Sequence, residues 1–185
     1  EYMGKHEEIP GDVHFRQGRM NCIACHTGAE MHASPEGSDT HRYAGAQMPA
    51  CTNCHAEVGA SDDPVQQHVL HQDKLSCQVC HSITYTSCDG CHVSISETTG
   101  NPKFKTDGTY MTFLIGLNTR QSEERPYKYV PVRHIPVDPN NYDYYGENLL
   151  PNFGALPTWA YATPHNIQRN TPQNSSCNAC HGNAE

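Results

Sequence analysis

Every cysteine of this 185-residue chain belongs to a Cys-x-x-Cys-His motif, and the motif occurs five times. In this motif both thiols add to one haem, and the histidine that follows binds the iron from the same side. Five copies that use every cysteine cannot be accidental and predict five covalently bound haems c. In chain order, motifs 1 to 5 are CIACH at 22–26, CTNCH at 51–55, CQVCH at 77–81, CDGCH at 88–92 and CNACH at 177–181.

Two other kinds of site also use many cysteines. Disulfides stabilise small secreted domains, but they do not explain a histidine after every second cysteine. Structural zinc sites need four tetrahedral ligands and place no histidine directly after a cysteine pair. We therefore favour haem attachment through Cys22, Cys25, Cys51, Cys54, Cys77, Cys80, Cys88, Cys91, Cys177 and Cys180, with iron ligands His26, His55, His81, His92 and His181.

Histidine is the second unusual residue, because thirteen histidines outnumber the twelve lysines and arginines together. The histidines outside the motifs are numerous enough to give each of the five irons a second imidazole. Methionine is the alternative axial ligand, but only Met48 lies shortly before a motif. We expect bis-histidine ligation on most haems, with distal ligands His14, His32, His71, His134 and His165, and with His41, His68 and His6 as further candidates.

Spacing limits which iron each histidine can reach. His14 lies so close before Cys22 that it serves a neighbouring haem more easily than its own, and the same holds for His71 before Cys77. His68 is one helical turn before His71 and could compete for the same face, where geometry favours His71. His6, near the first residue, could bind a haem of another subunit. Only SITYTS separates motifs 3 and 4, so their haems should be in near contact.

Composition restricts the class of protein and its partners. The formal charge is −8, and basic residues are too few for a nucleic-acid partner. Because the chain begins at Glu1 with no apolar leader, we expect a mature extracytoplasmic protein whose signal peptide has been removed. The longest apolar stretch, 111–117, is too short to span a bilayer, so we expect no integral membrane segment.

The fold class follows from the same features. With 36% hydrophobic residues and many glycines and prolines, the chain should wrap around a haem stack as mostly irregular structure with short helices and a small β-hairpin. We expect a helical turn at each motif, a helix over 65–72, and hairpin strands within 109–116 and 127–134. Residues 1–185 should form a single domain, with the haem-free insert 93–176 packed on the haems.

Four segments resemble multihaem cytochromes, a group that includes octahaem tetrathionate reductases, hydroxylamine oxidoreductase-like proteins and subunits of extracellular cytochrome filaments. In such relatives, histidines placed like His14, His32, His134 and His165 are distal ligands. The resembling segments total 73 of the 185 residues: DVHFRQGRMNCIACHTGAEMH at 12–32, CQVCHSITYTSCDGCH at 77–92, RPYKYVPVRHIPVDP at 125–139 and ATPHNIQRNTPQNSSCNACHG at 162–182.

The chain departs from the catalytic members of that group. Those enzymes have about eight haems and keep one open iron, often with a Cys-x-x-Cys-Lys motif or a tyrosine cross-link, whereas here every motif ends in histidine. The resemblance therefore implies electron transfer and no enzymatic activity. We expect a filament subunit that contacts further copies of itself, other redox proteins or an extracellular electron acceptor. A soluble or complex-bound carrier, or a reductase of a nitrogen or sulfur oxyanion, are the alternatives.

Overall fold

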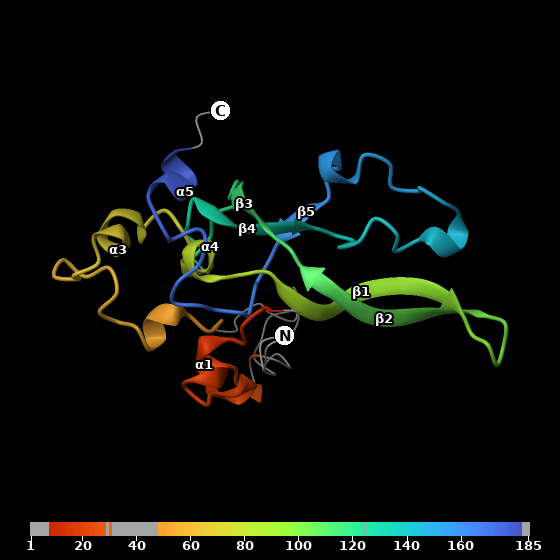
Figure 1. Cartoon of the computed structure of the whole chain (residues 1–185), viewed down its shortest axis with the longest axis horizontal. Coiled ribbons are helices and arrows are strands. Elements are labelled where there is room, and N and C mark those ends of the chain that lie inside the picture. The colour runs from red at the N-terminus through yellow and green to blue at the C-terminus, as the bar shows by residue number, and fades with distance from the viewer. Residues whose placement is uncertain (1–7, 29, 31–47, 124, 183–185) are drawn as a thin grey trace.

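The computed structural model describes residues 8–28, 30, 48–123 and 125–182, and excludes the side chains of 87–92, 106 and 107. Figure 1 shows an open arrangement in which the α-helices gather at one side and the longest strands extend to the other. The predictions for His6, His32 and His41 as ligands lie outside the described residues. Within the described part, no helix is long and apolar enough to cross a membrane.

Helices are few and short, as the sequence predicted. The α-helices are α1 (Val13–Arg16), α3 (Gln66–His71), α4 (Cys77–His81) and α5 (Asn178–His181). The 3-10 helices are η1 (Cys22–Ala24), η2 (Cys51–Asn53), η3 (Asp143–Tyr145) and η4 (Phe153–Ala155). The predicted helix over 65–72 is confirmed by α3, and the turn-rich segment after β4 contains only η3 and η4.

Motifs 1, 2, 3 and 5 each fold into one helical turn. In motifs 1, 2 and 5 the backbone N–H of the histidine donates to the carbonyl of the first cysteine, over 2.9, 3.0 and 2.9 Å. Motif 3 forms α4 itself. Since residues three and four apart share a helix face, this turn directs both cysteines and the histidine toward one side.

Motif 4 is different, and the prediction that it lies on a helical turn is wrong. It lies inside β1 (Tyr85–Ile95), which pairs antiparallel with β2 (Pro102–Met111). β-branched residues flank the motif, and Asp-Gly between its cysteines is a poor helix former. The register shifts by one residue between Ser87 and Gly90, which marks a β-bulge at Cys88 and Asp89, opposite Gly108. This hairpin, absent from our predictions, extends away from the helices (Figure 1).

The predicted hairpin in the insert is present with changed bounds. β3 (Leu114–Leu117) pairs with β4 (Tyr129–His134), and β5 (Trp159–Tyr161) adds an unpredicted third strand to β4. Tyr110 and Met111 belong to β2 instead of β3. The sheet is tied to motif 3, because Ser76 N donates to the carbonyl of Tyr129, directly before α4.

Residues 164–174, here called the strap, connect β5 to α5 and run between the N-terminal segment and α4. Asn166 is fully buried, and its side-chain amide donates to the carbonyl of Pro10 over 2.7 Å. On the other side, the Gln168 N–H donates to the carbonyl of His81 over 2.8 Å. Thr171 donates its hydroxyl proton to the carbonyl of Cys80. The strap therefore holds together the segments that carry motifs 1, 3 and 5.

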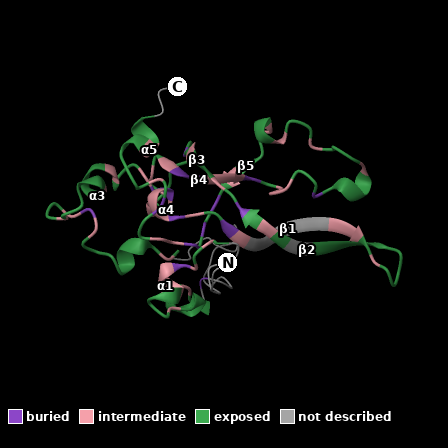
Figure 2. Ribbon diagram, viewed as in Figure 1, coloured by how far each residue is buried: buried purple, intermediate pink, exposed green. Residues whose placement is uncertain are grey.

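Very little apolar surface is buried by the polypeptide itself. The buried hydrophobic residues in the described part are Val79, Tyr85, Met111, Val130 and Ala162, and Figure 2 shows mostly exposed ribbon. The chain exposes 13153 Å², whereas a compact monomer of this mass exposes about 9,000 Å². Short helices and small antiparallel sheets in a largely irregular chain match the predicted fold class at this coarse level.

Candidate metal centres

Four motif histidines each face one histidine from outside the motifs. We name the pairs after their motifs. The ring centres lie 6.1 Å apart in pairs 1, 2 and 3 and 6.0 Å apart in pair 5. The members are His26 with His165 (pair 1), His55 with His14 (pair 2), His81 with His68 (pair 3) and His181 with His71 (pair 5).

This separation fits an iron bound between two imidazoles. A metal–nitrogen bond is about 2 Å long, and each nitrogen lies about 1.1 Å from its ring centre, so two axial imidazoles have centres roughly 6 Å apart. Aromatic rings in ordinary contact have centres anywhere between about 4.5 and 7 Å apart. A shared metal is therefore favoured because the same spacing of 6.0–6.1 Å recurs in four pairs built from different elements.

Hydrogen bonds orient several of these rings through Nδ1. The acceptors are Glu30 Oε2 for His26 at 2.8 Å and Asp63 Oδ2 for His68 at 3.0 Å. The Nδ1 atoms of His71 and His81 lie 3.0 and 3.1 Å from the carbonyl oxygens of Gln67 and Gln168. Each of these bonds uses Nδ1, which fixes the tautomer that presents an unprotonated Nε2 to a metal.

Pair 2 depends on the N-terminal helix. Asp12 caps α1 by accepting from Phe15 N over 3.0 Å, and its other oxygen accepts from Ile167 N of the strap over 2.7 Å. The carboxylate is buried, and α1 is thereby fixed against the strap. His14 on α1 then faces His55 of motif 2. Its spacing before Cys22 predicted a partner in a neighbouring motif and not in motif 1.

Pairs 3 and 5 share helix α3. Its residues His68 and His71 face histidines of two different motifs, although the sequence suggested that they compete for one position. Residues three apart on a helix differ in direction by about 60° and in height along the axis by about 4.5 Å. The two imidazoles can therefore face two different partner histidines. His68, which we had ranked below His71, therefore has a partner of its own.

The cysteines place the motifs in a definite order. Burial raises the pKa of the Cys25 thiol, and the neighbouring Cys54 and Cys51 of motif 2 raise it further. Burial also raises the pKa of Cys80, with a further contribution from Cys180 of motif 5. Motif 1 thus adjoins motif 2, and motif 3 adjoins motif 5.

Motifs 2 and 3 are joined by a thiol pair. Cys51 donates a hydrogen bond to Cys77, which lowers the pKa of the Cys77 thiol to about 7 and raises that of Cys51. Together these contacts order the motifs as 1, 2, 3 and 5. Figure 1 shows the same sequence of elements, from the N-terminal segment at the bottom through α4 to α5 at the top. We call this arrangement the row.

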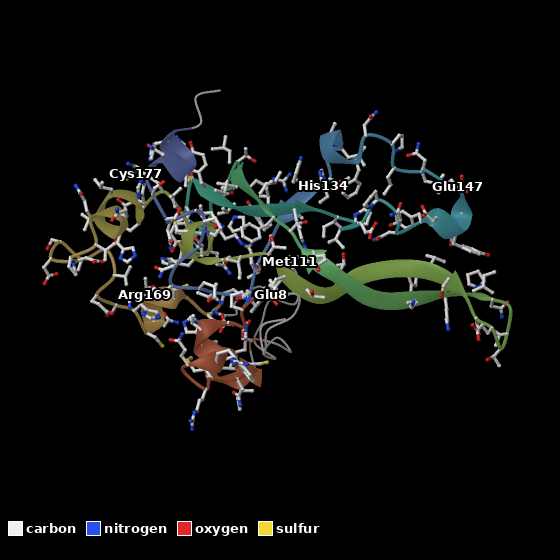
Figure 3. All side chains as sticks on the ribbon, in the orientation of Figure 1. Glu8, Met111, His134, Glu147, Arg169 and Cys177 are labelled. Atoms are coloured by element: carbon white, nitrogen blue, oxygen red, sulfur yellow. The ribbon has the colours of Figure 1, made fainter. Side chains whose placement is uncertain are left out.

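His134 has no motif histidine opposite it among the described side chains. It is 8% exposed on β4, its Nδ1 lies 3.1 Å from Thr158 Oγ1, and its ring centre is 3.7 Å from that of Trp159. Its Nε2 is buried without a hydrogen-bond partner. A buried nitrogen left unpaired in this way requires an explanation, and a metal bond is one. Figure 3 labels His134 beside the β4–β5 pair.

Some of the site was not predictable from the sequence. The partners Glu30 and Asp63 were missed, although an acidic residue four or five positions from a motif or candidate histidine is a usable signal for such a contact. No cluster of three or more potential metal-ligating side chains occurs in the described part of the chain. A haem needs only two protein ligands, so the histidine pairs are sufficient for it.

Comparison with known proteins adds no identification. No protein-family model matches the chain, and neither a curated protein nor a solved structure is significantly similar to it.

Proposed function

We propose that this protein binds five haems c covalently and transfers electrons through them. The observation that carries the proposal is the set of four histidine pairs, each joining a Cys-x-x-Cys-His motif to a distant histidine with ring centres about 6 Å apart. The motif supplies attachment and the pair supplies both axial ligands. A haem held in this way supplies an iron that gains and loses single electrons.

The residues have separable roles. Cys22, Cys25, Cys51, Cys54, Cys77, Cys80, Cys177 and Cys180 would form thioether bonds, while the paired histidines occupy both axial positions. Two imidazoles on one iron leave no position for a substrate, so this arrangement favours electron transfer over reduction of a bound molecule. The backbone turn of each motif holds its histidine on the side of its cysteines.

The thin apolar core also supports the proposal. On α3, Val69 and Leu70 are 40% and 56% exposed, and Ile23 within motif 1 is 81% exposed. The polypeptide alone leaves these apolar side chains open to solvent. Burying apolar surface against a cofactor stabilises a chain that cannot bury enough by itself.

The order of the row supports transfer along it. Since tunnelling falls steeply with distance, neighbouring motifs whose cysteines are close enough to influence one another's pKa support a path through sites 1, 2, 3 and 5. The cysteines of both terminal motifs, 1 and 5, are exposed. Electrons could therefore enter at one end and leave at the other.

We assign the fourth motif the remaining described histidine. Cys88, Cys91 and His92 would hold the fifth haem, with His134 as its distal ligand, because the buried Nε2 of His134 has no hydrogen-bond partner among the described residues. Replacing His134 with Gln should convert one haem from low to high spin in the paramagnetic resonance spectrum. An unchanged low-spin spectrum in that variant would exclude His134 as a ligand.

We extend the proposal to an extracellular filament in which further copies of the chain meet at the two ends of the row. Exposed motifs at both ends are what a head-to-tail, non-closing contact between copies requires. Electron microscopy of native secreted material tests this step. Filaments would support it, and discrete particles would favour a carrier or a subunit of a redox complex.

The test of the main proposal is expression in a host that matures cytochromes c. The intact mass should rise by five haems, and the pyridine haemochrome assay should agree. Replacing both cysteines of any one motif with serine should remove one haem from the mass. A protein without bound haem would refute the proposal, and a high-spin haem that binds nitrite would revive the reductase alternative.

A further inference from the structure

Two of the histidine pairs contain an imidazole that is hydrogen-bonded to a buried carboxylate. Glu30 lies 2.8 Å from Nδ1 of His26 in pair 1, and Asp63 lies 3.0 Å from Nδ1 of His68 in pair 3. Both carboxylate side chains are 6% exposed. The two acidic residues lie far apart in the sequence, yet each contacts a paired histidine in the same way.

The other hydrogen bonds to paired histidines have neutral acceptors. His71 of pair 5 lies 3.0 Å from the carbonyl of Gln67. In pair 2, the Asp12 oxygen is 3.6 Å from Nδ1 of His14, which is too long for a hydrogen bond. Both oxygens of Asp12 already accept backbone N–H groups, so Asp12 does not accept the Nδ1 proton of His14, although its charge lies near pair 2.

A carboxylate at Nδ1 changes what the imidazole offers to a metal. Accepting the Nδ1 proton makes the ring a stronger electron donor through Nε2. A buried negative charge is also poorly screened and favours the more positive oxidation state of a nearby iron. Both effects lower the reduction potential, whereas a backbone carbonyl carries no net charge and has a weaker effect.

We propose that Glu30 and Asp63 are positioning residues that lower the reduction potentials of sites 1 and 3, compared with the same sites carrying a neutral acceptor at Nδ1. The inference rests on the proposed function, since it concerns haems held by these pairs. Neither Glu30 nor Asp63 attaches a haem or binds its iron.

The experiment is a redox titration of the haem-loaded protein followed by paramagnetic resonance. Glu30→Gln and Asp63→Asn should each raise the midpoint potential of one haem, by about 59 mV for a tenfold change in its oxidised-to-reduced ratio. Glu57→Gln and Asp62→Asn are the matched controls, because they remove the same charge at exposed positions of the Asp63 segment. The controls should leave every midpoint within a small fraction of that shift.

Conservative variants separate an effect on the midpoint potential from an effect on folding. Asp63 also accepts the N–H groups of Gly59 and Val65, so Asp63→Asn disturbs its loop, whereas the Glu30 carboxylate is the simpler case. Glu30→Asp keeps the charge and should retain a lower midpoint than Glu30→Gln, at an unchanged haem count. If Glu30→Gln does not fold, the midpoint potentials of the Asp63 variants still test the inference.

The outcomes distinguish this inference from the proposed function. Wild-type protein that carries no haem defeats the proposed function itself. Fully haem-loaded variants of Glu30 and Asp63 whose midpoints move no more than those of the controls overturn only the inference.

Discussion

His165 faces His26 with ring centres 6.1 Å apart, although the two residues lie near opposite ends of the chain. The contact depends on the strap, whose neighbouring residue Asn166 is fully buried and bonded to Pro10. Figure 3 labels Arg169 in the middle of the strap and Cys177 beyond its C-terminal end. The C-terminal part of the chain thereby completes the site that the first motif begins.

Removing the carboxylate of Asp12 should destabilise the protein. Asp12→Ala loses the helix cap of α1 and leaves the N–H of Ile167 without its acceptor, which together cost about 2–4 kcal/mol. Denaturant unfolding measures the change. Asp138→Ala is the control, because it removes one exposed bond to Asn140 N and should change stability by less than about 0.5 kcal/mol. Equal effects in the two variants would contradict the role of Asp12 between α1 and the strap.

His68 and His71 should serve different irons. Each single substitution by Ala should turn one haem high-spin, and the double variant should turn two, because the two imidazoles face His81 and His181. Paramagnetic resonance counts the high-spin haems. Gln67→Ala on the same helix is the control and should leave all haems low-spin. A double variant with one high-spin haem would mean that the two histidines compete for a single iron.

Interrupting the row should stop end-to-end transfer. Replacing Cys77 and Cys80 with Ala removes site 3, which lies between sites 2 and 5, and should abolish conductance through single molecules held at the two ends. Replacing Cys88 and Cys91 also removes one haem but should leave the path through the row. Equal loss in both variants would refute the order of the sites.

The loop that carries Asp63 requires glycine at position 59. Gly59 has φ +80°, and a Cβ there would overlap the side chain of Gln72, which donates to the Gly59 carbonyl. Gly59→Ala should cost about 2–3 kcal/mol, from the left-handed backbone and the lost bond. Gly100 has φ +69° and open space around it, so Gly100→Ala should show the backbone cost of about 1–2 kcal/mol alone. Thermal unfolding compares the two, and equal losses would mean that the contact with Gln72 is unimportant.

Local chemistry was predictable because it depends on neighbours in the chain. The five motifs, the helix at α3 and the hairpin of β3 with β4 follow from residue types at fixed spacing. The helical turn of four motifs was also predicted. In motif 4, Asp89 and Gly90 are the local sequence signal that favours the observed bulged strand over a helical turn.

Pairing between distant histidines was decided by tertiary structure alone. Nothing in the spacing of His68 and His71 indicates that one faces motif 3 and the other motif 5, because the choice depends on where α4 and α5 lie in space. Likewise, His14 and His165 face their partner histidines because hydrogen bonds of Asp12 and Asn166 join the N-terminal segment to the strap. The sequence alone determined which residues can bind haem, since attachment needs only adjacent side chains. Tertiary structure decided which two histidines face each other, since that depends on contacts between segments far apart in the chain.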